Sequence, residues 1–114
     1  MEGANKYGPY SAGVKAGGTI WLSGQIDVDS GDTIEVQTQG ALDKIDALLG
    51  EAGASKHDVV FAQVLLKSMD FYASMNEVYS KWVDSMDVIP ARASFAVDAL
   101  TADALVEIVD QTIR

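Results

Sequence analysis

Apolar residues recur every three or four positions in two parts of the chain, and this spacing predicts two helices. The first covers about Thr33 to Ala52, with a buried face formed by Ala41, Leu42, Ile45, Leu48, Leu49 and Ala52. Gly53 follows as the C′ residue that ends it. The second is predicted from Asp70, as its N-cap, to about Val83. Its apolar stripe comprises Phe71, Met75, Val78, Tyr79 and Trp82.

Shorter apolar runs bounded by glycines and polar residues predict strands. Ser11 to Lys15 and Thr19 to Ser23 flank Ala16-Gly17-Gly18, where glycines supply the positive φ of a tight hairpin turn. The run VVFAQVLL, Val59 to Leu66, is typical of a central strand that is covered on at least one face. Two more strands are expected at Ala93 to Val97 and at Leu105 to Ile113.

The order of elements is ββ, with room for a short strand, and then αβαββ. Helices interleaved with a mostly antiparallel sheet give an α+β layer, in which both helices pack on one face of the sheet. A chain of 114 residues with 48% hydrophobic content is enough for one core, so residues 1–114 are expected to form a single domain. The uncovered sheet face favours pairing with other subunits and sites in the clefts between them.

The composition argues against a metal site or a catalytic thiol. The chain has no cysteine and a single histidine, His57, in a stretch expected to be a solvated loop. Asp27 to Asp32 invites comparison with a calcium loop, but Gly31, Asp32 and Thr38 stand where an EF-hand requires Asp or Asn, Gly and Glu. We therefore expect no metal ion. We also expect no nucleotide cofactor, because the sequence contains no glycine-rich nucleotide-binding motif.

The charge of the chain limits its partners. Seventeen acidic and eight basic residues give a formal charge of −9, and the basic residues are scattered singly, so nucleic-acid binding is not expected. No stretch approaches the roughly 20 apolar residues of a membrane helix, and the first 25 residues do not resemble a signal peptide. We therefore expect an unprocessed cytoplasmic protein with no membrane partner.

Two charged residues stand at unusual places. Arg92 follows Pro90-Ala91 and precedes an apolar strand, where its guanidinium could bind a carboxylate through two parallel hydrogen bonds. Glu107 interrupts the apolar run Leu105 to Val109 and must face water or a polar cleft. A surface arginine or subunit salt bridge, and a solvent-facing glutamate, are the simpler interpretations. If the two residues lie on adjacent strands, they could hold a carboxylate and a water molecule side by side.

Five short motifs in order give the chain a recognisable pattern. They are Gly8-Pro9-Tyr10-Ser11, Ser23-Gly24-Gln25-Ile26, Asn76-Glu77-Val78-Tyr79, Pro90-Ala91-Arg92 and Leu105-Val106-Glu107-Ile108. Together, over about Lys6 to Ile113, they resemble the RidA/YjgF family. The resemblance implies a chorismate-mutase-like fold, related to the ferredoxin-like fold, and a homotrimer whose sheets form an inner barrel with three active sites between neighbours.

The resemblance also implies a chemistry. Family members hydrolyse reactive enamines and imines such as 2-aminoacrylate to 2-ketoacids and ammonia without a cofactor, as 2-iminobutanoate/2-iminopropanoate deaminases. By this resemblance Arg92 binds the substrate carboxylate and Glu107 helps to place the attacking water. Substrate-binding positions are matched by Tyr10, Ser23, Asn76 and Ser94, the last standing where many relatives carry cysteine.

Further departures from the pattern concern substrate preference. Ala12 stands where glutamine is common, Val109 replaces a second acidic residue, and the loop from Asp27 to Gln37 is shorter than in typical members. Two other functions stay open at this point. The first is a non-catalytic trimeric sensor of small carboxylates. The second is the ribonuclease or translation-inhibitor activity attached to some members, against which the charge of −9 argues.

Overall fold

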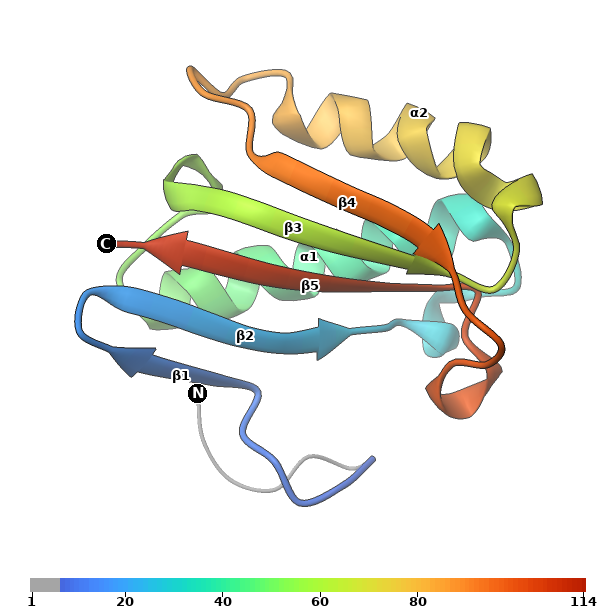
Figure 1. Ribbon diagram of the computed structural model, residues 1–114, viewed down its shortest axis with the longest axis horizontal. Coiled ribbons are helices and arrows are strands. Elements are labelled where there is room, and N and C mark those ends of the chain that lie inside the picture. The colour runs from blue at the N-terminus through green and yellow to red at the C-terminus, as the bar shows by residue number, and fades with distance from the viewer. Residues whose placement is uncertain (1–6) are drawn as a thin grey trace.

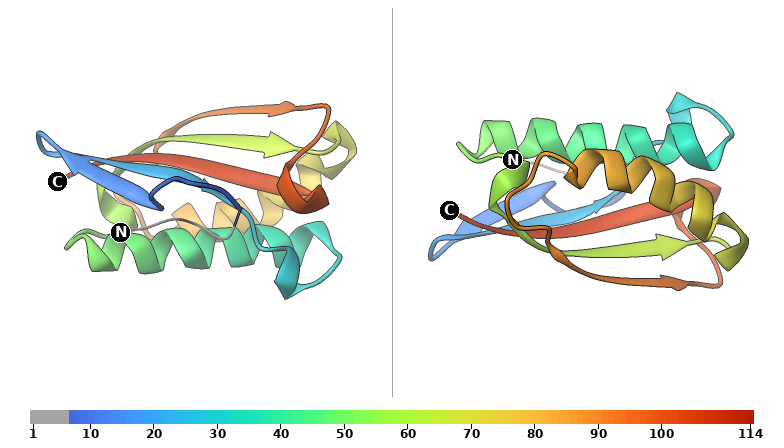
Figure 2. Two further views of the ribbon diagram at one scale, coloured as in Figure 1. Left: turned by 90° about the horizontal axis from the view of Figure 1, so that it is seen from below. Right: turned by 90° about the horizontal axis from the view of Figure 1, so that it is seen from above.

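The computed structural model describes residues 7–114, which form one sheet covered on one face by two helices (Figures 1 and 2). This arrangement confirms the predicted α+β class. The strands and helices are β1 (Gly13–Ala16), β2 (Thr19–Gln25), α1 (Ile34–Glu51), β3 (Val59–Leu66), α2 (Tyr72–Val83), β4 (Ala91–Ala96) and β5 (Val106–Ile113). No helix in the described part of the chain is long and apolar enough to span a membrane.

Within residues 7–114 the sheet has five strands in the order β1-β2-β5-β3-β4 (Figure 1). The pairs β1–β2, β2–β5 and β5–β3 are antiparallel, whereas β3 and the edge strand β4 run parallel because α2 forms the crossover between them. The predicted hairpin turn is confirmed, since Gly17 and Gly18 have φ of 56° and 82°. The predicted strand Val59–Leu66 is also confirmed.

The core lies between the sheet and the helices, as the periodicities predicted. On α1 the residues Ala41, Leu42, Ile45 and Leu49 are fully buried, and on α2 Met75, Tyr79 and Trp82 join them. Strand β5 alternates between its two faces: Val106, Ile108, Asp110 and Thr112 are buried beneath the helices, and the residues between them face the other way. The alternation of β5 therefore decides which face of the sheet each of its polar side chains reaches.

Three expectations about local structure are wrong. In place of a short strand before α1, a 3₁₀ turn spans Val28–Ser30. Helix α2 begins at Tyr72 and not at Asp70, because Ser68 caps a preceding 3₁₀ turn by accepting a hydrogen bond from the Asp70 N–H. Strand β4 begins at Ala91, so Arg92 lies inside the strand and not before it.

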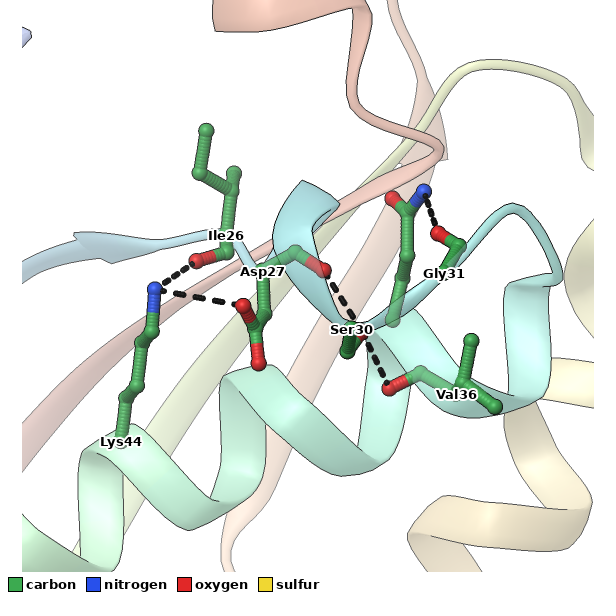
Figure 3. A network of polar contacts seen from close by, with 7 residues as sticks. Ile26, Asp27, Ser30, Gly31, Val36 and Lys44 are labelled. Carbon is green, nitrogen blue, oxygen red and sulfur yellow. Dashed lines mark hydrogen bonds and ion pairs between the residues drawn. The ribbon is translucent and has the colours of Figure 1, made fainter.

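The 3₁₀ turn before α1 is held by its own polar contacts (Figure 3). Lys44 donates to the Ile26 carbonyl at 2.8 Å and lies 3.6 Å from the Asp27 carboxylate. The Ser30 hydroxyl donates to the carbonyls of Asp27 and Val36. Asp27 is thus turned toward a lysine, and within residues 7–114 no group of three or more histidine or acidic side chains could hold a metal ion.

The sheet face opposite the helices carries apolar side chains that no element of residues 7–114 covers. Trp21, Phe95 and Ile113 are 50%, 43% and 56% exposed, and Phe61 and Leu65 of β3 are partly buried on the same face. Trp21, Phe61 and Val109 line a hollow of about 240 Å³ there. Apolar surface of this kind favours association, and the homotrimer stays a prediction.

Candidate functional site

Arg92 lies on the helix-covered face of the edge strand β4. It pairs with Ala62, which is buried beneath the helices, so its side chain points toward α2. The guanidinium carbon lies 4.8 Å from the ring centroid of Tyr79 and 5.7 Å from that of Tyr72, and Nη2 donates to the Tyr72 hydroxyl at 3.1 Å. Two aromatic rings therefore stabilise the cation and limit its orientation.

The guanidinium of Arg92 keeps donors available for a ligand. Within residues 7–114 it forms no ion pair with an acidic side chain, and its side-chain hydrogen bonds go to the Tyr72 hydroxyl and, at 4.0 Å, to the Met75 sulfur. A hydrogen bond with Asn76 and the nearby Arg92 charge lower the pKa of the Tyr72 phenol. This combination suits the binding of a carboxylate by the free edge of the fork.

Beside the guanidinium is a hollow of about 260 Å³, which we call the Arg92 cavity. Its lining residues are Asn76, Tyr79, Ser80, Val83, Ile89, Pro90 and Arg92. The predicted site residues Asn76 and Arg92 are thus brought together. Ser94, two positions along β4, lies on the same face, but its hydroxyl is buried without a hydrogen-bond partner and does not line this cavity.

Glu107 lies on the other face of the sheet. It pairs with Leu65, whose side chain points away from the helices. The Glu107 carboxylate lies directly over Gly24, where a Cβ atom would overlap it. Gly24 is part of an irregularity in the β2–β5 pairing between Leu22 and Gln25. Partial burial raises the pKa of the Glu107 carboxyl above its ordinary value of 4.5.

A second hollow of about 310 Å³, the Glu107 cavity, surrounds this carboxylate. Its lining residues are Tyr10, Ser23, Gly24, Thr101 and Glu107. The Ser23 hydroxyl donates to the Ser11 carbonyl at 2.6 Å, which ties the segment that carries Tyr10 to β2. Ala102 and Asp103, which follow Thr101, have φ of 56° and 55°, strained values for residues other than glycine.

The predicted site residues therefore form two groups: Asn76 and Arg92 in the Arg92 cavity, and Tyr10, Ser23 and Glu107 in the Glu107 cavity. The condition under which Arg92 and Glu107 could act side by side, namely that they lie on adjacent strands, is not met within one chain. Strand β3 separates β4 from β5, and the two side chains point to opposite faces. The reason is the pairing register, which places Arg92 beside Ala62 and Glu107 beside Leu65.

Sequence reasoning missed Tyr72 and Thr101 as site residues. A signal for Tyr72 was available in the second helix, where Tyr72, Asn76 and Tyr79 stand at positions i, i+4 and i+7 and so share one face. Thr101 carried no such signal, because its place beside Glu107 depends on the path of the loop between β4 and β5.

One further carboxyl lies outside both cavities, within the core. Asp110 is 3% exposed, and Oδ1 accepts a hydrogen bond from Thr112 at 2.9 Å, while Oδ2 has no partner. Burial raises the pKa of Asp110 to about 7, and the hydrogen bond from Thr112 opposes the shift. The group is therefore a cost to stability at neutral pH.

Within residues 7–114 the chain is an α+β fold of two helices and a five-stranded sheet, with the candidate site residues in two separate hollows. Comparison with known proteins identifies the family. The model of a family described as Endoribonuclease L-PSP matches residues 3–111. A RutC family protein of Pyrococcus abyssi is 42% identical over 107 residues, 88% of this chain and 82% of the relative.

Solved structures agree with this comparison. A putative endoribonuclease L-PSP from Entamoeba histolytica has a TM-score of 0.90 and 31% identity, covering 98% of this chain and 93% of the other. The structure of Escherichia coli TdcF with bound serine has a TM-score of 0.88 and 29% identity, with the same coverage. The chain is a member of the YjgF/RidA family, in agreement with the resemblance found in its sequence motifs.

Proposed function

We propose that the protein is a cofactor-independent hydrolase that converts reactive enamines or imines of the 2-aminoacrylate type to 2-ketoacids and ammonia. The observation that carries this proposal is the guanidinium of Arg92, which lies between two aromatic rings at a cavity and forms no ion pair within residues 7–114. A fixed planar fork of this kind binds a small carboxylate in one orientation. The related TdcF structure contains bound serine, a small molecule with a carboxylate and a nitrogen on the adjacent carbon.

The active site would lie between two copies of the chain. Arg92 and Glu107 point to opposite faces of one sheet, so one copy would supply the Arg92 cavity and its neighbour the Glu107 cavity. A closed ring of three copies would repeat this contact three times and cover the apolar sheet face. Sedimentation velocity at micromolar concentration tests the assembly, and a monomer there would contradict the shared cleft.

The reaction needs little more than orientation and proton transfer. With the substrate carboxylate on Arg92, the imine carbon faces a water molecule held by Glu107. An enamine enters as its imine tautomer, in which the proton lost from nitrogen has moved to the terminal carbon. The water oxygen bonds to the imine carbon while Glu107 takes a proton from the water, the C=N π electrons move to the nitrogen, and Glu107 returns the proton to this nitrogen. The carbinolamine then collapses: Glu107 moves the hydroxyl proton to the nitrogen, the C=O bond forms, the C–N bond breaks and ammonia leaves. The raised pKa of Glu107 suits a group that both accepts and returns a proton.

Ammonia release from imines generated in place by an amino-acid oxidase or a dehydratase tests the proposal. We expect the protein to accelerate ammonia release above the uncatalysed rate. A trimer that binds 2-ketoacids without any acceleration would support the alternative, a non-catalytic sensor of small carboxylates, because Arg92 serves binding in either case.

A ribonuclease function is the remaining alternative, since the matching family carries an endoribonuclease description. The formal charge of −9 opposes the approach of a phosphate backbone, and the binding of RNA depends on neutralising phosphates with Lys and Arg. We expect no cleavage of single-stranded RNA under the conditions of the imine assay.

A further inference from the structure

The loop between β4 and β5 brings a hydroxyl group to the Glu107 cavity. Thr101 lies in this loop, in a 3₁₀ turn that spans Thr101–Asp103, and it lines the cavity together with Glu107 of β5. The loop lies at the same end of the sheet as the end of β2, which carries Ser23 and Gly24 (Figure 1). No step of the proposed reaction uses Thr101.

The turn that carries Thr101 is strained and is held in place by its neighbours. The Ala104 N–H donates to the Thr101 carbonyl at 3.1 Å. Ala102 and Asp103 have positive φ, which is unfavourable for residues other than glycine. The Asp103 carboxylate accepts a hydrogen bond of 2.9 Å from Lys67, which follows β3. Backbone strain of this kind is concentrated at functional sites, where it fixes the position of a side chain.

The polar groups of the Glu107 cavity leave room for a bound water molecule. The Ser23 hydroxyl already donates to the Ser11 carbonyl, whereas the Thr101 hydroxyl and the Glu107 carboxylate form no hydrogen bond within residues 7–114. Partial burial raises the pKa of the Glu107 carboxyl. A partly buried carboxylate and a hydroxyl that line one cavity without protein partners are groups that water bridges.

An attacking water molecule needs two hydrogen-bond acceptors and one free lone pair. Glu107 accepts the hydrogen that it removes as a proton in the proposed reaction. The other hydrogen stays on the oxygen that bonds to the imine carbon, so its acceptor must hold it without taking it. A hydroxyl oxygen has lone pairs for this purpose and is a far weaker base than a carboxylate. Holding both hydrogens directs the lone pair of the water toward the substrate.

We propose that the Thr101 hydroxyl oxygen accepts the second hydrogen of the attacking water, so that Thr101 and Glu107 form one water-binding site. The inference rests on the proposed function and adds a positioning residue to it. The water oxygen bonds to the imine carbon, one proton goes to Glu107, and the other hydrogen stays on the new hydroxyl group until the carbinolamine collapses. Thr101 neither gains nor loses a proton, so it affects the rate and not the pH dependence.

Thr101→Val and Thr101→Ser separate the hydroxyl from the rest of the side chain. Valine keeps the shape of threonine but accepts no hydrogen bond. We expect kcat for ammonia release to fall by about three- to tenfold, as for the loss of one neutral hydrogen bond, with KM within about twofold of wild type. Serine keeps the hydroxyl and should retain kcat within about twofold. The acidic limb of the pH profile should be unchanged in both variants, because Glu107 remains the base.

Thr19→Val is the matched control, because it removes the hydroxyl of a partly exposed threonine in β2 that does not line the Glu107 cavity. It should keep wild-type kcat and KM. In the Glu107→Gln background, Thr101→Val should lower kcat by less than about twofold, because both residues act on the same water.

Three outcomes would overturn the inference and leave the proposed function intact. They are wild-type kcat in Thr101→Val, an equal loss in Thr101→Ser, and a loss confined to KM, which would make Thr101 a substrate contact. A full three- to tenfold loss in the Glu107→Gln background would also overturn it, because the two residues would then act independently.

Failure of the proposed function has a different signature. If no imine is hydrolysed faster than in buffer, a crystal structure of the assembled protein that resolves bound water decides whether the water site exists. One water should lie within about 3.2 Å of both Thr101 Oγ1 and a Glu107 carboxylate oxygen, and the structure of Thr101→Val should lack it. The absence of a shared water, or the same water in Thr101→Val, would overturn the site itself.

Discussion

The Arg92 cavity and the Glu107 cavity stabilise their charged groups in opposite ways. Around Arg92, the rings of Tyr72 and Tyr79 and the hydroxyl of Tyr72 stabilise a cation that has no acidic partner within residues 7–114. Around Glu107, a glycine and partial burial withdraw a carboxylate from water and raise its pKa. One region is suited to binding a fixed negative charge, the other to exchanging a proton.

This difference depends on the separation of Arg92 and Glu107 within one chain. An arginine and a glutamate that met within one chain would form an ion pair, which would occupy the fork and lower the pKa of the carboxyl. Because the two side chains of one chain lie on opposite faces of the sheet, they do not form this ion pair with each other. Binding and proton transfer can then be removed independently, and the following predictions use that independence in order of decreasing effect on activity.

The largest loss is expected from Arg92→Lys. A lysine ammonium is a point charge without the planar fork, so it can neither bind a carboxylate bidentately nor keep its orientation between Tyr72 and Tyr79. Imine hydrolysis should be nearly abolished while the thermal unfolding midpoint and the oligomeric state are unchanged. Wild-type kcat/KM in the intact assembly would show that no carboxylate is bound by Arg92.

Glu107→Gln should lower kcat by roughly 10²–10⁴, the usual range for a general acid–base group, with a smaller change in KM. The variant keeps the size of the side chain over Gly24. Because the pKa of Glu107 is raised, wild-type activity should fall as the pH decreases through that pKa, where the base becomes protonated, and the variant should lack this acidic limb. Unchanged kcat would make Glu107 a solvent-facing residue, and a dissociated variant would make it an interface residue.

Mixing the two inactive variants should restore part of the activity. If each cleft takes Arg92 from one copy and Glu107 from the next, random assembly of equal amounts of Arg92→Lys and Glu107→Gln chains leaves roughly a quarter of the clefts with both wild-type residues. Ammonia release after unfolding and refolding the mixture measures this fraction. Activity no higher than the sum of the separate variants would exclude a shared site.

Tyr72→Phe should have a moderate effect confined to binding. The ring over the guanidinium remains, but the hydrogen bond from Arg92 Nη2 is lost. We expect KM to rise by about three- to tenfold, which corresponds to the loss of one hydrogen bond of roughly 0.7–1.4 kcal/mol, with kcat nearly constant. A fall in kcat at constant KM would instead assign the Tyr72 phenol to proton transfer.

Asp110→Asn should leave activity unchanged and alter stability alone. The folded-state pKa of Asp110 is about 7 and its ordinary value is 3.8, so the folded state binds the proton more tightly than the unfolded state. Wild-type stability should therefore decrease between about pH 4 and pH 7, and the variant should lack this decrease. Urea unfolding at pH 4.5 and pH 8 measures the difference. If the free energies of unfolding of wild type and variant change equally between the two pH values, Asp110 is not the source of the pH dependence.

The sequence predicted the elements far better than the faces of the sheet. The helical stripes and the strand Val59–Leu66 are encoded by local periodicity, and the hairpin by two glycines. The motifs likewise contained the candidate residues of both cavities. The face on which Arg92 lies was not predictable, because β4 reads ARASFA, which has no clear alternation, and its register depends on the distant strand β3.

The opposite orientations of Arg92 and Glu107 have a consequence for inheritance. In a ring of three, every polypeptide would serve two different clefts, one through each face of its sheet. A subunit altered at both residues would then silence two clefts of any ring that incorporates it, so a cell with one altered and one normal allele would keep about a quarter of its clefts, and not half, if the two chains mix at random. An altered chain that cannot assemble would lack this effect.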